Sequence, residues 1–481
     1  MNHDPCSSRR LMAVLAAASL AACTAGPDFQ RPAGPEVARY TPGTPPTHTT
    51  SAATALGEAQ RFQVGTQIDA RWWQALGSAE LDAWIERALA ANPSLAAARA
   101  TLRQAQQLHS ARAGSTLYPQ VDAGIGTQRA RVNPSTQGQV GEAREFSLYN
   151  AGIGISYRLD LAGGNRRALE ALAARTEHRR HELAGAQLSL AARITGAAIT
   201  RARLAGQIAS IETLVQTQDE HLALTRQRVR LGQAAPAEPL ALQAQLEQTR
   251  ASLPALRKQL EQSEHLLAVL AGEPPGAAQV PAFTLDRFRL PTDLPLLLPS
   301  ELVRRRPDIL AAEALVHTAN AEYGVAVARL YPQLSLSASL SSQALSSAAL
   351  FGGGSAVWAL VGQLTQALFN PGLPAEKRAS LAALDAAAAN YQVVVLGALQ
   401  EVADSLRALS HDAEALASLA AADAASQASL ASVQRQHALG AASYVQLLVA
   451  RQQAEQSRTG LIAAQAQRLV DSAALWQALG G

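Results

Sequence analysis

The chain has 481 residues, of which 48% are hydrophobic, 16% are charged and only 4% are aromatic. Alanine and leucine dominate the apolar residues, and this composition is typical of long, closely packed helices rather than of several compact domains. The net charge is +3 without any dense run of lysine and arginine, so the clustered basic face that nucleic-acid binding requires is missing. We therefore predict no nucleic-acid partner.

Residues 1–22 have the features of a secretory signal peptide. Arg9 and Arg10 precede an apolar run that is too short to cross a bilayer as a helix. The run ends in Leu-Ala-Ala-Cys, which resembles a bacterial lipobox, so Cys23 is the candidate lipidation site, the residue that would carry palmitate and other lipid. Thr24 follows, where lipoproteins kept in the inner membrane usually have aspartate, so this resemblance implies delivery to the outer membrane. The alternative is an ordinary signal peptide with an incidental cysteine.

Residues 23–70 are rich in proline, which removes backbone donors and blocks helices. We predict an extended, lipid-anchored tether for this segment. Beyond the signal peptide we find no run of about 18 apolar residues and predict no transmembrane helix.

The first predicted repeat, residues 71–272, contains two helices, two strands and a long helical hairpin. Its boundaries follow from the change of hydrophobic period between about 3.6 and 2 residues. The predicted ranges are helices 81–89 and 93–117, strands 118–127 and 146–161, and helices 165–231 and 240–270. We expect Pro254 to disturb the last helix.

A proline-rich linker, residues 273–299, leads to a second repeat, residues 300–481, with the same order of elements. The predicted ranges are helix 307–330, strands 331–340 and 357–370, helix 377–439 and a last helix that ends at Trp476. Helix 377–439 carries a heptad of apolar residues, which predicts coiled-coil packing. Its members are Leu381, Ala388, Val395, Val402 and Leu409 at one position, and Leu384, Tyr391 and Ala398 at another.

The two repeats match most clearly in their last hairpins. The spacing from Gly232 to Gly272 equals the spacing from Gly440 to Gly480. At the same offset several residues are identical: Leu240 and Leu448, Gln245 and Gln453, Glu247 and Glu455, Arg250 and Arg458. Tandem halves of this length predict two equivalent hairpins rather than a short-period solenoid.

The four strands predict an oligomer. Strands of about 10 residues are long enough to cross an outer membrane when tilted. Four of them cannot close a barrel, an open edge in lipid leaves backbone groups unpaired, and known single-chain barrels begin at about 8 strands. Helix 377–439 would be roughly 95 Å long at about 1.5 Å per residue, far longer than a compact domain needs. Membrane strands joined to such helices indicate a tube, and therefore a conduit.

Two groups of residues resemble the signatures of the outer-membrane efflux family, the TolC-like outer membrane factors. The first group is Trp72-Trp73, Leu81, Ala88-Leu89, Asn92-Pro93 and Leu95. The second group is Arg305-Arg306-Pro307-Asp308-Ile309, Ala312-Glu313, Ala319-Asn320, Gly324 and Tyr331-Pro332. The resemblance covers essentially the whole mature chain, and Cys23 with Gly26-Pro27-Asp28 resembles the lipoprotein branch of the family.

The resemblance implies a mostly α-helical fold with a membrane β-barrel part. Each chain would supply four strands and its duplicated long hairpins, and three chains would form a barrel of about 12 strands on a helical tunnel. The implied partners are two further copies of the chain, a periplasmic adaptor (membrane fusion protein), an inner-membrane pump and outer-membrane lipid. The implied function is a passive exit duct for drugs and other small toxic compounds, from the periplasm to the exterior.

The resemblance also implies a narrow periplasmic aperture at the two hairpin turns. Val445 lies where relatives place an apolar constriction, beside Gln446. Relatives commonly have aspartate at the position of Val449 and arginine at that of Gln452, so this chain departs from a charged gate. Glu238, where relatives often have aspartate, is the candidate for an acidic ring. The alternative is that all five residues only pack between helices or lie in solvated turns.

We find no catalytic constellation and predict no enzyme, no metal and no cofactor. The run from His178 to Glu182 has metal-binding residue types but lacks the His-Glu-x-x-His spacing of zinc hydrolases. Two alternatives compete with the duct. A periplasmic adaptor lipoprotein would have compact β domains flanking one hairpin, and a lipid-anchored enzyme on a helical scaffold would need a polar catalytic cluster.

Overall fold

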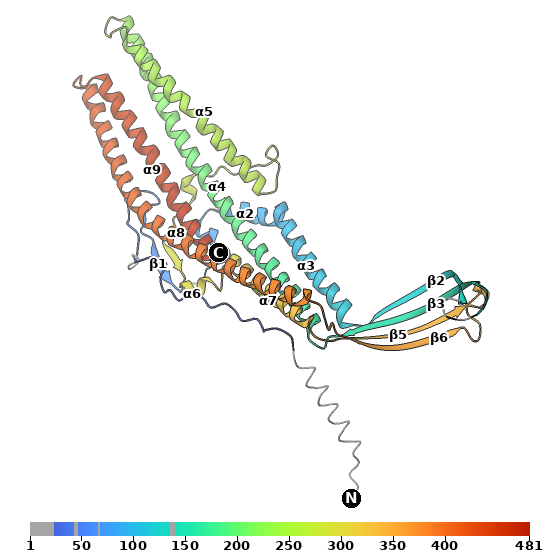
Figure 1. Cartoon of the computed structure of the whole chain (residues 1–481). Helices are drawn as coiled ribbons and strands as arrows, with labels where there is room; N and C mark the ends of the chain where they lie inside the picture. The colour runs from blue at the N-terminus through green and yellow to red at the C-terminus, as the bar shows by residue number, and fades with distance from the viewer. Residues whose placement is uncertain (1–23, 43–46, 66–67, 135–137, 139) are drawn as a thin grey trace. The chain divides into compact units, whose positions relative to one another are not determined.

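A computed structural model describes residues 24–42, 47–65, 68–134, 138 and 140–481, so the predicted signal peptide and Cys23 lie outside the described residues. The chain divides into two compact units, whose helices and strands are labelled in Figure 1. Unit 1 comprises the described residues up to Pro32, Thr101–Arg180 and Ala311–Tyr391; unit 2 comprises Ala33–Ala100, His181–Leu310 and Gln392–Gly481. Both predicted repeats contribute to both units, so the units cut across the predicted division of the chain.

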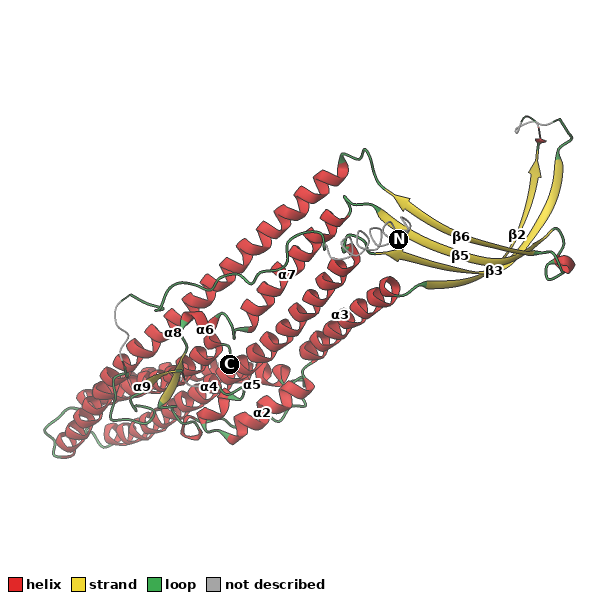
Figure 2. Cartoon of the chain, turned by 90° about the horizontal axis from the view of Figure 1, so that it is seen from below, coloured by secondary structure: helices red, strands yellow, loops and turns green. Residues whose placement is uncertain are grey.

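Unit 1 contains one antiparallel sheet of four strands (Figure 2). The strands are β2 (Gln120–Val132), β3 (Arg144–Leu159), β5 (Gln333–Ala344) and β6 (Ala356–Thr365), in the spatial order β2-β3-β5-β6. All four lie where strands were predicted, although their ends differ. β2 extends past the predicted end because its last residues stay paired with β3, where Arg129 and Glu145 form an ion pair of 3.2 Å. β6 stops at Thr365 because that residue pairs with Gln333, the first residue of β5.

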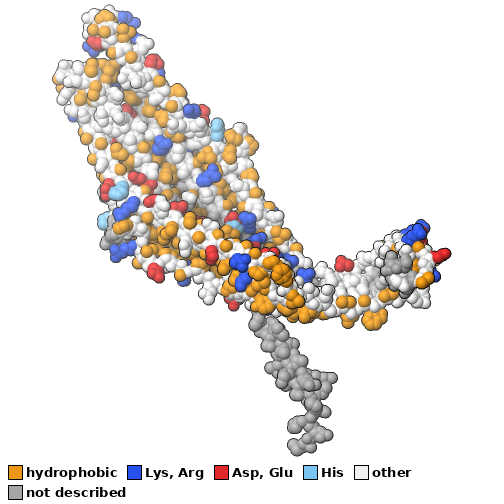
Figure 3. All heavy atoms as spheres, in the orientation of Figure 1, with side chains coloured by type: hydrophobic (Ala, Val, Ile, Leu, Met, Phe, Trp, Pro, Cys, Tyr) orange, Lys and Arg blue, Asp and Glu red, His pale blue; other side chains and the backbone are white. Residues whose placement is uncertain are grey.

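The register sorts the side chains of the sheet into two faces. On one face Leu340 is the cross-strand partner of both Ile153 and Trp358. The side chains of Leu340 and Trp358 are 61% and 76% exposed, although both are strongly apolar. On the other face Ser337 pairs with Ser156, which pairs in turn with Gln120. The sheet therefore has one apolar face and one largely polar face, and its charged side chains gather mostly at the loop end (Figure 3).

The segment after Cys23 is held on unit 1. The guanidinium of Arg167, on helix α4 (Gly164–Arg230), donates to the backbone carbonyls of Ala25 and Gly26 and lies 2.7 Å from the Asp28 carboxylate. Asn320, on helix α7 (Pro307–Ala328), donates to the carbonyl of Pro27 at 3.1 Å. The start of the predicted tether is therefore fixed by hydrogen bonds rather than free.

Unit 2 is built on two helical hairpins. One hairpin pairs α4 with α5 (Glu238–Leu270), and the other pairs α8 (Gly372–Ala438) with α9 (Tyr444–Leu479). Shorter elements complete the fold: η1 (Trp72–Leu76), α2 (Ala79–Ala91), α3 (Pro93–Leu117, shared with unit 1), η3 (Leu285–Arg287), α6 (Pro299–Leu302) and, in unit 1, η4 (Ser347–Ala349). α5 continues through Pro254, contrary to our expectation. Pro254 lies on the exposed side of the helix, where water can bond the carbonyl that the proline leaves free.

A small parallel pair of strands was not predicted. β1 (Arg61–Val64) pairs with β4 (Asp293–Leu296), so parts of the predicted tether and of the predicted linker belong to the folded unit. Next to β1, the Gln60 amide donates to the carbonyl of Pro291 and to the hydroxyl of Ser472 on α9. Long-range hydrogen bonds of this kind leave no periodic signal in the sequence.

The predicted heptad is buried in unit 2 but not along its whole length. Val402 and Leu409 are fully buried, whereas Leu381 is exposed. One stretch of α8 is also long and apolar enough to cross a membrane by length and composition alone, which differs from our expectation of no such helix. The alanine-rich sequence explains this hydropathy, and one such stretch is weak evidence for a membrane span.

A charged cluster is buried in unit 2 beside β1. Arg468 on α9 is fully buried and donates to Gln60 at 2.8 Å and to the carbonyl of Glu58 at 3.2 Å. One turn further along α9, burial and the neighbouring Asp412 carboxyl raise the pKa of Asp471 to about 7. A buried carboxyl with a raised pKa favours its neutral form. Asp471 therefore holds a proton in the folded protein at pH values where the unfolded chain has lost it.

This proton makes stability depend on pH. Because the native state binds the extra proton, the free energy of unfolding should fall as pH rises from about 4 to about 7, by at most about 1.4 kcal/mol per pH unit. Asp471→Asn should remove this dependence, and Glu261→Gln, an exposed position on α5, should retain it. Melting temperatures at pH 5, 6 and 8 test this prediction. Equal pH dependence in Asp471→Asn and the unmodified protein would contradict it.

Candidate functional site

The predicted aperture residues lie at the turns of the two hairpins in unit 2. Both turns have the same hydrogen-bonding pattern. Gln233 donates its backbone N–H to the carbonyl of Arg228, and Ala441 donates to that of Gln436, each at 2.8 Å. Each bond closes around a glycine, Gly232 or Gly440, with φ of 70° or 73°. Glycine adopts this left-handed conformation without a steric penalty, so it ends both helices.

Three of the predicted residues share one exposed stripe of α9. Val445, Val449 and Gln452 are spaced four and three residues apart, which places them on one helical face. Val445 and Val449 are 67% and 62% exposed. These two exposed valines give the turn of the second hairpin an apolar edge.

Gln446 and Glu238 serve as helix caps at equivalent positions. The side chain of Gln446 accepts the backbone N–H of Ser443 at 2.7 Å, and Ser443 accepts that of Gln446 in return. Glu238, on the other hairpin, accepts the backbone N–H of Ala235 at 3.2 Å. Each side chain satisfies a backbone donor at the start of a helix. The structure thus places Val445, Val449 and Gln452 on one face of α9. Gln446 and Glu238 are instead hydrogen-bonded to the backbone of their own turns.

The contact that joins the two hairpins was missed by the sequence analysis. The ring of Tyr444 on α9 lies 5.0 Å from the ring of His221 on α4 and 5.8 Å from that of His437 on α8. Beneath it, Leu222 and Leu246 belong to a small buried core against which Tyr444 packs. Tyr444 is one of few aromatic residues in this chain and stands directly beside a turn, which is the signal that could have identified it.

Tyr444 is partly buried, and basic side chains lie near it. Burial raises the pKa of Tyr444 to about 12, and its hydroxyl has no hydrogen-bond partner among the described residues. The pKa of His221 is lowered by burial and by the positive charges of Arg451 and His437, against a smaller opposing effect of Glu220. The neutral form of His221 is therefore favoured where it packs on Tyr444. We name Tyr444, His221 and His437 the tip contact.

No group of three or more His, Cys, Asp or Glu side chains is placed to hold a metal ion within the part of the chain that the structure describes. The site therefore consists of two hairpin turns, an apolar stripe and a contact between hairpins.

Known proteins resemble the chain over nearly its full length. The pyoverdine export outer membrane protein OpmQ of Pseudomonas aeruginosa is 32% identical over 344 residues, which cover 70% of this chain and 72% of that protein. The probable efflux pump outer membrane protein TtgC of Pseudomonas putida is 29% identical over 468 residues, covering 96% and 93% of the two chains. The structure of the outer-membrane channel OprN matches with a TM-score of 0.85 at 28% identity and covers 95% of this chain and 99% of that chain.

The family model described as outer membrane efflux protein matches residues 84–273 and 298–481, most of the chain. These findings confirm the family resemblance and favour the efflux channel over the adaptor and scaffold alternatives, and the named relatives are channel or export proteins rather than enzymes. The chain belongs to the outer membrane efflux protein family and is an outer-membrane efflux channel component.

Proposed function

We propose that three copies of the chain close one barrel of about 12 strands and that the barrel is the membrane part of a passive exit duct. The observation that carries this proposal is the four-stranded sheet with an apolar and a polar face. Its edge strands, β2 and β6, pair on one side only among the described strands. Backbone groups exposed to hydrocarbon must be paired, so β2 of one copy would pair with β6 of the next.

Exposed apolar residues outside the sheet also support assembly. In unit 2, Val393 and Leu396 on α8 are both more than half exposed. A monomeric soluble protein rarely leaves such side chains in a contiguous uncovered patch. We infer that neighbouring copies cover this part of α8 in the trimer.

The lipid anchor and the partners complete the proposal. The hydrogen bonds of Arg167 to Ala25 and Gly26 support an anchor on Cys23 that is held next to unit 1, since only one residue separates Cys23 from Ala25. A periplasmic adaptor and an inner-membrane pump would deliver drugs and other small toxic compounds to the duct. The duct itself would be passive.

Adjacent residues of β5 test the barrel. Leu340→Arg places a charge on the apolar face, which should cost roughly 2–4 kcal/mol at the bilayer midplane and prevent assembly in the membrane. Ser339→Arg places the same charge on the polar face and should leave assembly intact while lowering conductance. The measurements are the amount of trimer extracted from outer membranes and its single-channel conductance. Equal assembly of both variants would contradict the assignment of the two faces.

We also propose that the exposed stripe of α9 forms an apolar constriction at the periplasmic end. Val445 and Val449 would face the passage with Gln452, while Gln446 and Glu238 hold the two turns that carry the constriction. An apolar ring resists wetting and so limits the flow of ions.

Val445→Ser should raise the single-channel conductance in planar bilayers, because a hydroxyl favours water in the constriction. Gln477→Ser, an exposed position near the other end of the same helix, should leave the conductance unchanged. Equal conductance of the two variants would contradict a constriction at Val445, and it would leave the proposed duct unaffected.

The tip contact should respond to acid. Because the pKa of His221 is lowered in the folded state, the stability that neutral His221 contributes is lost as pH falls through that lowered value. Protonated His221 would face Arg451 and His437, and among the described residues Glu220 offsets them. We therefore expect conductance to rise on acidification, and this response to be lost in His221→Gln. Tyr444→Phe should behave like the unmodified protein, because the hydroxyl has no hydrogen-bond partner among the described residues. Tyr444→Ala should conduct more at every pH.

A further inference from the structure

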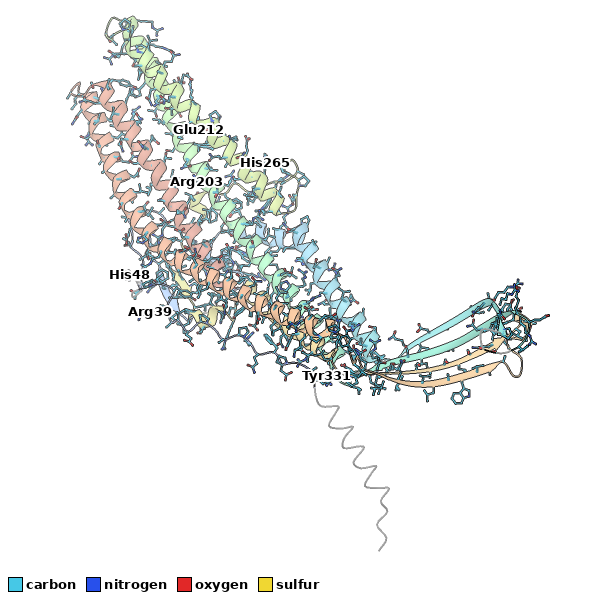
Figure 4. All side chains as sticks on the ribbon, in the orientation of Figure 1. Arg39, His48, Arg203, Glu212, His265 and Tyr331 are labelled. Carbon is cyan, nitrogen blue, oxygen red and sulfur yellow. The ribbon has the colours of Figure 1, made fainter. Side chains whose placement is uncertain are left out.

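A polar cavity of about 180 Å³ lies in unit 1 where the sheet meets the helices. Tyr331, labelled in Figure 4, marks this junction between α7 and β5. Three arginines from different elements line the cavity: Arg112 from α3, Arg158 from β3, and Arg329, which follows α7. Asp160 is the one carboxylate among the residues that line this cavity.

Two of these arginines lack a counter-charge. No carboxylate among the described residues lies within ion-pair distance of Arg112 or Arg158; the bond that Arg112 makes, to the Asn165 side chain, is long at 3.5 Å. Arg329 differs, since it pairs with Glu376 at 3.0 Å. Two guanidinium groups therefore bring uncompensated positive charge to one cavity.

Asp160 offsets only part of this charge, and it forms no ion pair with Arg112 or Arg158 among the described residues. Its carboxylate accepts the backbone N–H groups of Asn165 at 3.0 Å and of Arg166 at 2.8 Å, which caps the start of α4. The nearest cation is the Arg166 side chain at 3.9 Å. The Asp160 carboxylate thus hydrogen-bonds to the backbone at the start of α4 rather than pairing with Arg112 or Arg158.

The neighbouring cavity in unit 1, of about 520 Å³, carries less unpaired positive charge. It shares Arg112 and Arg329 with the first cavity, and its further cation, Arg175, is paired with Glu322. The excess of positive charge is therefore larger at the end of the cavity system that adjoins the sheet, where Arg158 adds to the unpaired Arg112. A general basic surface would not show this contrast.

The register places Arg158 on the polar face of the sheet. Arg158 pairs with Ser335, which pairs with Gln363, and it alternates with Tyr157 and Leu159 on the apolar face. In the proposed barrel the polar face lines the passage, because the apolar face meets lipid. Arg158 would then point toward the passing solute, with Arg112 beside it.

We propose that the cavity bounded by Arg112 and Arg158, which we name the junction cavity, binds the oxyanion group of small molecules in transit, a carboxylate or phosphate, and gives the channel a preference for anions. This inference rests on the proposed barrel. The guanidinium group presents a planar fork of donors that matches such oxyanions and is weakly hydrated. Three copies would place six of these groups around the passage. Exposed, water-accessible arginines bind weakly enough to release the anion, as conduction requires.

The test is the reversal potential of the trimer in a potassium chloride gradient. The unmodified channel should prefer chloride, and Arg112→Gln with Arg158→Gln should lower the anion-to-cation permeability ratio by about twofold or more. Arg226→Gln with Arg257→Gln removes the same charge from unit 2 and should leave the ratio unchanged. Equal ratios in the unmodified channel and the junction variant would overturn the inference while the barrel stands. Failure to extract a trimer of the unmodified protein from outer membranes would instead overturn the barrel.

Two further arms separate the possible ligands. Inorganic phosphate should reduce the chloride current of the unmodified channel, and this block should weaken in Arg112→Lys with Arg158→Lys, which keeps the charge but loses the fork. Equal block in both proteins would contradict bidentate binding. The measurements are repeated in bilayers of phosphatidylcholine alone and with added phosphatidylglycerol. A preference for anions that disappears with the anionic lipid would assign the cavity to a lipid headgroup and overturn binding of a transported solute.

Discussion

A backbone amide or carbonyl in hydrocarbon has no water to bond, and the proposed membrane assembly depends on that constraint. Among the described residues, one chain supplies a four-stranded sheet with an apolar face, a polar face and two edges that pair with no further strand. Such a sheet is stable in a membrane only when further copies pair with its edges. The family membership, the exposed apolar side chains of the sheet and the proposed trimer are all consistent with this one requirement.

The long helices of unit 2 form two similar hairpins. The part of α4 within unit 2, His181–Arg230, is about 75 Å long at about 1.5 Å per residue. Each hairpin turns at a glycine, Gly232 or Gly440, and the backbone hydrogen bond that closes the turn is equivalent in both. The repeats differ where function is proposed: Tyr444 and His437 correspond to Pro236 and Val229 of the first repeat, so only the second hairpin carries the aromatic side of the tip contact.

Much of this fold could be predicted because its signals are local. The alternation from Leu334 to Leu340 sets the two faces of β5 through neighbours two residues apart, and Gly232 and Gly440 end their helices through contacts within one turn. The β1–β4 pair, the buried Arg468 and the tip contact could not be predicted, since each joins segments hundreds of residues apart or on separate helices. Of the candidate site, the exposed stripe of Val445 and Val449 follows from helical spacing, whereas the capping bonds of Gln446 and Glu238 require the geometry of each turn.

The central claim is that three chains share one barrel. Its most direct measurement is the mass of the complex extracted from outer membranes in mild detergent, with the bound detergent subtracted. The account predicts three times the mass of one mature chain, together with resistance of the complex to dissociation on dilution. A single chain, or one that leaves the membrane without detergent, would contradict it.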